Sequence, residues 1–107
     1  MKRLRHVFKV ATARSTGGAI YTVPEDEIGT NMAELAGTTG VFGETATGVT
    51  LGALKAAVAA GEVGPTARVV LLVTGDGLKT PGPVSHTYHP IMIKADADAF
   101  MDQVLVA

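Results

Sequence analysis

The sequence predicts a small α/β domain, and three observations support this. Short β-branched runs alternate with amphipathic stretches of helical spacing, which is typical of α/β folds. The chain has 107 residues, 47% of them hydrophobic and mostly Ala and Val, with five aromatic residues and no Trp. Its 13 glycines indicate tight turns and close backbone contacts. We therefore expect a single domain over residues 1–107, a three-layer-like unit with a short parallel or mixed sheet and about three helices.

The first predicted elements are a strand over residues 17–23 and a helix over residues 25–36. The strand follows a glycine turn and contains β-branched and aromatic residues. The helix has apolar residues spaced at i, i+4, i+7 and i+8. Thr22 and Glu25 have the spacing of a capping box at its start, and Gly37 is its expected stop.

A second helix is predicted over residues 45–60, after the short apolar pair at 41–42 and before Gly61. Gly48 and Gly52 lie one turn apart inside this helix, and each costs about 1 kcal/mol relative to Ala. Because this cost occurs twice, we expect another backbone or a ligand to approach the helix closely.

The second half of the chain contains two further apolar runs and a closing helix. Residues 68–73 are continuously β-branched or Leu apart from Arg68, which predicts a strand covered on both faces. Residues 91–93 form either an edge strand or an extended arm. The apolar spacing over residues 96–106 predicts the closing helix.

Composition and charge argue against several classes of function. The net charge of −1 argues against nucleic acid as the main partner, and no run of about 18 apolar residues predicts a membrane span. The basic opening, residues 1–6, is not followed by an apolar run of signal-peptide length, so we expect a cytoplasmic protein. The chain has no Cys, which excludes disulfides, zinc–thiolate sites and cysteine nucleophiles.

Two groups of potential metal ligands are better explained as surface residues. Asp96, Asp98 and Asp102 lack the glycine and terminal Glu of a calcium loop, and they suit the first turns of a helix. His86 and His89 have no third ligand nearby in the sequence. No metal site is expected.

The strongest candidate site is the turn TGDGLKT, residues 74–80. A phosphate-binding P-loop would need glycines where the chain has Val73 and Leu78, and Pro81 prevents the helix that such a loop opens. The P-loop is therefore rejected. A hydroxyl at the carboxyl end of a strand lies where α/β folds bind ligands, so we expect Thr74 to end a central strand and to be exposed toward a cleft.

The residues around this turn leave alternatives open. Gly75 and Gly77 would let a flat ligand approach the backbone, although a simple tight turn explains them equally. Glu44, in the turn before the second helix, is either a helix cap or a second member of the same site.

Four segments together resemble the C-terminal end of the bacterial threonine synthases, in this order: GGAIYTVPEDEI, GTTGVFGETATGVTLGALKAAVAAGEVGP, ARVVLLVTGDGLKT and HPIMIKADADAF. The resemblance covers residues 17–107, and nothing before about Arg14 is placed by it. Its most specific part is the TGxGLK turn together with the GETAxGVT helix start.

The resemblance implies a pyridoxal-phosphate lyase of the tryptophan-synthase-β fold type, which forms threonine and phosphate from O-phosphohomoserine and water in amino-acid biosynthesis. It implies that the Thr74 hydroxyl hydrogen-bonds the pyridine nitrogen, that Gly75 and Gly77 shape the turn, and that Glu44 lines the same cleft. A neutral hydroxyl does not hold a proton on that nitrogen as a carboxylate would, which moderates the cofactor as an electron sink.

Several parts of the family's site have no counterpart in these segments. The Schiff-base lysine, the phosphate-binding glycine loop and the Asn at the ring hydroxyl belong to upstream segments of the family. The resemblance therefore implies a C-terminal piece with no catalytic residue of its own, inactive alone and binding no cofactor alone. The expected partner is the missing N-terminal part of the enzyme or a second copy in a homodimer. The alternative is a non-enzymatic interaction module that self-associates.

Overall fold

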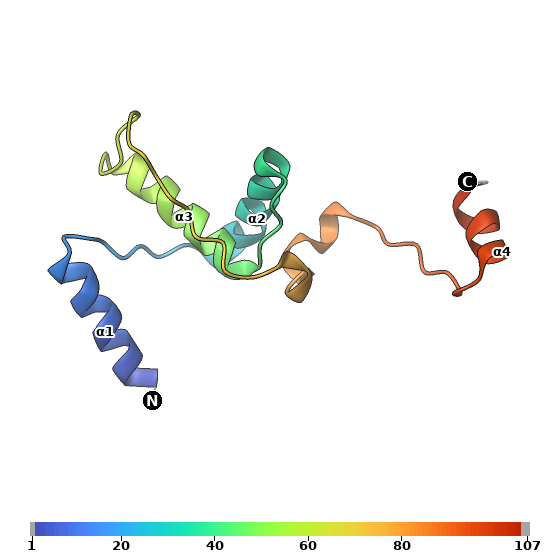
Figure 1. Ribbon diagram of the computed structural model, residues 1–107, viewed down its shortest axis with the longest axis horizontal. Coiled ribbons are helices and arrows are strands. Elements are labelled where there is room, and N and C mark those ends of the chain that lie inside the picture. The colour runs from blue at the N-terminus through green and yellow to red at the C-terminus, as the bar shows by residue number, and fades with distance from the viewer. Residues whose placement is uncertain (1, 106–107) are drawn as a thin grey trace.

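The computed structural model describes residues 2–105, and its regular structure there is helical (Figure 1). Two long helices cross in the middle of the molecule, while one helix lies at each end of the chain. The elements in chain order are α1 (Lys2–Ser15), α2 (Glu25–Thr39), α3 (Thr45–Ala59), the 3-10 helices η1 (Gly77–Lys79) and η2 (Gly82–Thr87), α4 (Ala97–Phe100) and the π-helical turn η3 (Met101–Leu105).

No sheet forms within residues 2–105, so the predicted α/β class is wrong. The runs predicted as strands, residues 17–23 and 68–73, contain no strand. Residues 91–93, predicted as an edge strand or an extended arm, form no strand either. One isolated antiparallel bridge joins Gly43 and Asp76. The reason is that a strand leaves its N–H and C=O groups pointing sideways and needs a neighbour to pair them. A β-branched run predicts extended backbone, but it does not supply that neighbour.

The predicted helix at residues 25–36 is confirmed as α2, with different ends. The helix continues through Gly37 and stops at Gly40, which adopts φ 74° and donates its N–H to the Ala36 carbonyl. This left-handed glycine is the usual way to end a helix, so the stop lies three residues later than predicted. The predicted capping box is absent, because Pro24 takes the N-cap position and no side chain caps the helix there.

Helix α3 agrees with the helix predicted at residues 45–60, and its two glycines face α2. A Cβ on Gly48 would lie 2.5 Å from the backbone oxygen of Ile28. A Cβ on Gly52 would meet the side chains of Val23 and Asn31. The expected close approach is therefore confirmed, and the neighbour of Gly48 is the backbone of another helix.

The core lies where α2, α3 and η2 meet. Its buried cluster contains Ile28 and Met32 from α2 and Val84 from η2, and Met32 is fully buried. Gly29 allows η2 to pack directly on α2, because a Cβ at this position would collide with the backbone oxygen of Pro83. The core is therefore built on close contacts between backbones.

Polar contacts extend this core to its edges. The Lys55 ammonium on α3 donates to Asn31 Oδ1 at 2.9 Å and forms an ion pair with Glu34, both on α2. Beyond the C-terminal end of α3, the Tyr21 hydroxyl donates to the Glu62 carboxylate. These bonds fasten the middle of α2 to α3, and the chain before α2 to the residues that follow α3.

The ends of the described chain differ from expectation in two ways. Helix α1 was not predicted. The predicted closing helix at residues 96–106 is present as α4 followed by η3, and residue 106 lies outside the described range. Among the described residues, no helix combines the length and the apolarity that crossing a membrane requires.

Candidate functional site

The two segments that the sequence placed in one site lie side by side. After α3, the chain returns along the length of this helix, so that residues 75–77 meet the residues before it. The Glu44 N–H donates to the Gly75 carbonyl at 3.0 Å, and the Gly77 N–H donates to the Phe42 carbonyl at 2.9 Å. These two bonds flank the Gly43–Asp76 bridge. They fix the Thr74 turn against the N-terminus of α3.

Glu44 is the N-cap residue of α3, but its side chain makes no capping bond. Its carboxylate instead lies against Gly75, in the space that a Cβ at that position would fill. Glycine is therefore needed at 75 for the carboxylate to take this place. The Glu44 side chain therefore does not cap α3, and its membership of a ligand site stays a prediction.

Gly77 is buried, and its missing Cβ makes room for the ring of Phe42. The turn is stabilised beyond it by Asp76, whose Oδ1 accepts the N–H of Leu78 at 2.8 Å. Thr80 closes the arrangement, because its hydroxyl accepts the N–H of Thr45 at 3.1 Å. Since that N–H belongs to the first turn of α3, Thr80 caps the helix from a distant part of the chain.

Thr74 is exposed at the entrance of the turn, as predicted, while the cleft that it was expected to face stays a prediction. The expectation that it ends a central strand is wrong, because the run before it pairs with no strand in the described chain. Its hydroxyl lies next in sequence to the glycine that carries the Glu44 carboxylate. A threonine hydroxyl can both donate and accept a hydrogen bond, whereas a carboxylate only accepts.

The remaining candidates do not gather around this turn. His86 and His89 are exposed, and residues 2–105 contain no group of three or more His, Cys, Asp or Glu side chains placed to hold a metal. Lys55 is held at Asn31 and Glu34.

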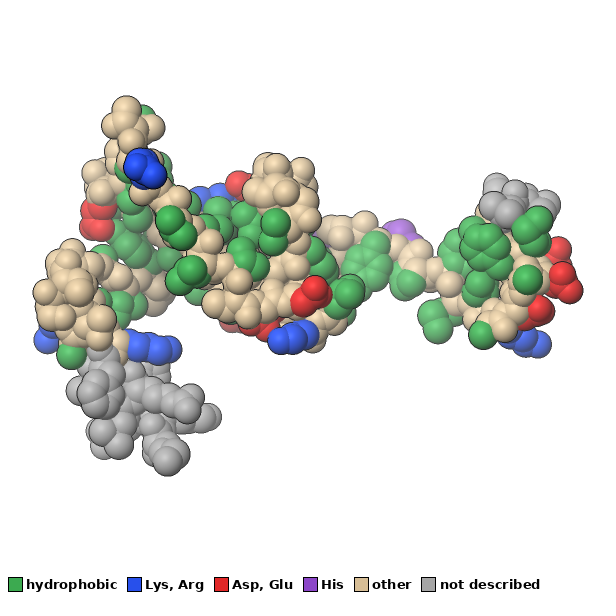
Figure 2. Space-filling view, viewed as in Figure 1, with side chains coloured by type: hydrophobic (Ala, Val, Ile, Leu, Met, Phe, Trp, Pro, Cys, Tyr) green, Lys and Arg blue, Asp and Glu red, His purple; other side chains and the backbone are tan. Residues whose placement is uncertain are grey.

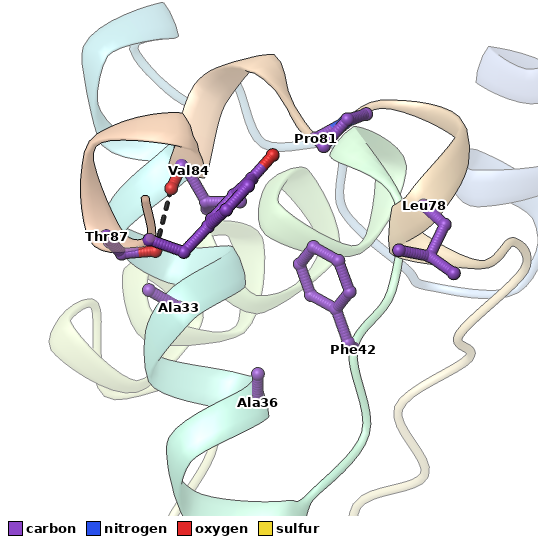
Figure 3. A pocket seen from close by; sticks show the side chains of 8 residues that line it. Ala33, Ala36, Phe42, Leu78, Pro81, Val84 and Thr87 are labelled. Carbon is purple, nitrogen blue, oxygen red and sulfur yellow. Dashed lines mark hydrogen bonds between the residues drawn. The ribbon is translucent and has the colours of Figure 1, made fainter. Parts of the chain in front are cut away.

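An apolar hollow of about 510 Å³ opens on the other side of the Phe42 ring (Figure 3). Ala33 and Ala36 of α2 form one wall, and Phe42 and Leu78 form another. Pro81, Val84, Thr87 and Tyr88 complete it. The Thr87 hydroxyl is already paired, because it donates to the Val84 carbonyl at 2.7 Å. The hollow contains none of the four predicted site residues.

Sequence reasoning missed two contributors to this region, Phe42 and Thr80. Phe42 belongs to a short apolar pair that was noted without a role. The TGDGLKT motif was taken to end at Thr80, before a proline. A residue that caps a helix 35 positions away leaves no local pattern, so only the fold reveals it. The same holds for the hollow, because its walls come from separate segments.

Comparisons with known proteins agree on one family. The sequence model of the pyridoxal-phosphate dependent enzymes matches residues 4–75. A threonine synthase from Halalkalibacterium halodurans is 32% identical over 99 residues, which cover 91% of this chain and 28% of that protein. The chain therefore spans little more than a quarter of the length of this relative. The family match includes Glu44, Thr74 and Gly75, and it begins before Arg14, where the sequence resemblance had placed nothing.

Proposed function

We propose, from the premise that the chain belongs to the pyridoxal-phosphate dependent enzymes, that it forms the wall of a cofactor site which faces the pyridine nitrogen. The observation that carries the proposal is the pair of backbone bonds between residues 42–44 and 75–77. They hold the turn that follows the exposed Thr74 against the chain at Glu44, and these two segments lie about 30 residues apart in the sequence.

The residues at this turn fit one edge of a flat pyridine ring. The Glu44 carboxylate already lies against Gly75, so the residue that offers the ring a partner is the exposed Thr74, through its hydroxyl. A pyridine nitrogen needs one hydrogen-bond partner in the plane of the ring, which a hydroxyl provides. Neither Thr74 nor Glu44 is a cation or a helix N–H group, so this edge does not suit the cofactor's phosphate.

Each residue would then have a distinct task. The Thr74 hydroxyl would hydrogen-bond the ring nitrogen and leave it without a full positive charge, whereas a carboxylate would hold a proton there. Glu44 would border the same edge, and its own N–H bond to Gly75 would keep the two segments in register. When bound, pyridoxal phosphate supplies an electron sink for the carbon next to an amino group.

The finer proposal concerns the reaction. The similarity to a threonine synthase supports a threonine-forming lyase that acts on O-phosphohomoserine. The 107-residue chain by itself is expected to be inactive, because nothing aligns one of its lysines with a Schiff-base lysine. The chain would form one wall of a cofactor site, and other segments of the enzyme would form the remaining walls.

A chimera tests the proposal directly. The aligned segment of the Halalkalibacterium threonine synthase is replaced by this chain, and the chimera is assayed for cofactor absorbance and for threonine formed from O-phosphohomoserine. We expect a loaded, active chimera. Thr74→Val should lower its turnover up to about tenfold, as expected from the loss of a hydrogen bond of roughly 1 kcal/mol, while Thr74→Ser should retain most of it.

Two controls accompany the chimera assay. The isolated chain, mixed with pyridoxal phosphate, should develop no Schiff-base absorption band above that of free lysine. Gly37→Ala, far from the turn, should leave the chimera unchanged. A loaded chimera in which Thr74→Val changes neither the cofactor spectrum nor the turnover would contradict the role of the Thr74 hydroxyl.

A further inference from the structure

Thr80 fastens the far end of the Thr74 turn next to the point where Gly75 fastens its near end. The Gly75 carbonyl accepts the N–H of Glu44 at 3.0 Å, and the Thr80 hydroxyl accepts the N–H of Thr45 at 3.1 Å. Glu44 and Thr45 are consecutive residues at the start of α3. Both ends of the turn are therefore tied to one place, and Thr74 lies directly outside the nearer of the two ties.

The backbone between these two ties is itself hydrogen-bonded. It contains the 3-10 helix η1, whose first N–H groups are capped by Asp76, because its Oδ1 accepts the N–H of Leu78 at 2.8 Å. At the other end of η1, the Thr80 N–H donates to the Gly77 carbonyl at 3.0 Å, which is the i→i+3 pattern of a tight helical turn. Because these bonds fix the connecting backbone, a displacement of Thr80 is passed on to Gly75.

The start of α3, which holds both ends of the turn, is closely packed. Thr47 is 1% exposed, and its side chain occupies the space that a Cβ on Gly43 would fill. Gly43 also forms the isolated bridge with Asp76. The turn is therefore tied to a well-packed part of the molecule.

The chain that leads into Thr74 offers less restraint within the described residues. Val70 and Leu72 are exposed, and the run that contains them belongs to no helix or strand. Figure 2 shows hydrophobic groups on the surface of the central part of the molecule, and it shows the C-terminal part as a separate mass joined to the centre by a narrow connection. In this structure the position of Thr74 thus depends mainly on the ties that follow it.

We propose that Thr80 is a positioning residue: its hydroxyl holds the turn in the docked place from which the Thr74 hydroxyl can meet the pyridine nitrogen. This role rests on the proposed function and adds to it a residue that contacts no ligand. Thr80 is half-buried, and its hydroxyl already accepts a backbone N–H, so its effect on the cofactor passes through the turn. A turn held by few bonds opens locally, and the loss of one of these bonds should raise the open population about fivefold.

The first test needs no cofactor and uses amide hydrogen exchange in the 107-residue chain. Thr80→Val should lower the protection of the Gly77 N–H, which is bonded to the Phe42 carbonyl, by about fivefold, and Thr80→Ser should restore it. The matched control is Ala53→Gly, within α3, which costs the helix about as much as a lost cap. This control should leave Gly77 protected, because the turn opens without unfolding α3.

Two results of this measurement would overturn the role of Thr80. One is unchanged protection of Gly77 in Thr80→Val. The other is an equal loss of protection in Thr80→Val and in Ala53→Gly, because Thr80 would then act only through the stability of α3.

The second test uses the chimera and the pH midpoint at which the absorption of its bound cofactor changes. Thr80→Val should shift this midpoint in the same direction as Thr74→Val, although Thr80 does not contact the ring. The double variant should shift it little further than Thr74→Val alone, because both substitutions act on one hydrogen bond. Thr80→Ser and Ala53→Gly should leave the midpoint in place.

The outcomes separate the role of Thr80 from the proposed function. A shift in Thr74→Val without one in Thr80→Val would overturn the positioning role and leave the proposed function intact. Additive shifts would also overturn it, because Thr80 would then act on the cofactor independently of Thr74. A chimera that binds no cofactor, or one whose midpoint neither variant moves, would contradict both the proposed function and the role of Thr80.

Discussion

The α2–α3 pair and the run at residues 68–73 both contain apolar residues, yet they differ completely in structure. Each helix pairs its own backbone groups, so α2 and α3 need only a complementary face, which Gly48 and Gly52 provide. The run needs a neighbouring strand to pair its backbone, and the described chain offers none. Within it, Val70 is 86% exposed, whereas Met32 between the helices is fully buried. Apolar composition alone therefore does not decide whether a segment is buried. What decides it is whether the backbone N–H and C=O groups find hydrogen-bond partners within the segment or need a neighbouring strand.

The largest expected effect comes from truncating the centre of the packed region. Met32→Ala should lower the free energy of unfolding by roughly 2–5 kcal/mol, because it removes buried contacts and leaves a cavity. Val70→Ala, in the unpaired run, should change it by less than about 0.5 kcal/mol. Chemical denaturation followed by circular dichroism measures both. Equal losses for the two variants would show that the run is packed after all.

The next effect distinguishes glycines that are needed from those that are not. Gly48→Ala should destabilise the chain by roughly 1–3 kcal/mol, because the new methyl group meets the Ile28 backbone oxygen and forces the helices apart. Gly37→Ala, also within a helix, has nothing within 4 Å of the added carbon and should stabilise by up to about 1 kcal/mol. The opposite signs, read from melting curves, are the test. A stabilising Gly48→Ala would refute the close packing.

A smaller effect is expected where the packed helices meet the returning chain. Thr80→Val removes the hydroxyl that accepts the Thr45 N–H and should cost about 1 kcal/mol, as the loss of a helix cap does. Thr80→Ser keeps the acceptor and should restore most of this stability. If the Val and Ser variants unfold at the same denaturant concentration, the hydroxyl has no capping role.

The smallest effect is electrostatic and lies at the edge of α3. The hydrogen bond to the Glu62 carboxylate, assisted by partial desolvation and by the carboxylate charge, raises the pKa of Tyr21 above its ordinary value. Since the folded state then holds the phenol proton more tightly, this contact stabilises below about pH 10 and is lost as the pH rises above it. In a Tyr88→Phe background, where Tyr21 is the remaining tyrosine, Glu62→Gln should shift the ultraviolet titration of Tyr21 to lower pH. An unchanged midpoint would refute the contact.

The sequence predicted the features whose causes are local. The apolar spacing of α2 and α3 gave both helices, and the paired Gly48 and Gly52 gave their close contact. The sheet was predicted wrongly, because the run at 68–73 shows which backbone it favours and says nothing of its partners. For the candidate site, the segments of Glu44 and Thr74 were expected to meet and do so through backbone bonds, while their role in a ligand site stays a prediction. Their supports, Phe42 and Thr80, depend on contacts between distant residues.

The bond between Thr45 and Thr80 joins residues 35 positions apart, whereas α2 and α3 follow each other with a turn of five residues, 40–44. Closing the longer loop costs about 3 kcal/mol in chain entropy, and few contacts compensate for it. The helical hairpin should therefore form first, and the Thr74 turn should dock onto it later and detach from it most often. Amide hydrogen exchange should report this order, because the Gly77 N–H would exchange well before the Gly40 N–H. The Thr74 turn, which is proposed to contact a ligand, is thus also the part of the chain that detaches most often. A ligand that binds only the docked turn would stabilise the docked state.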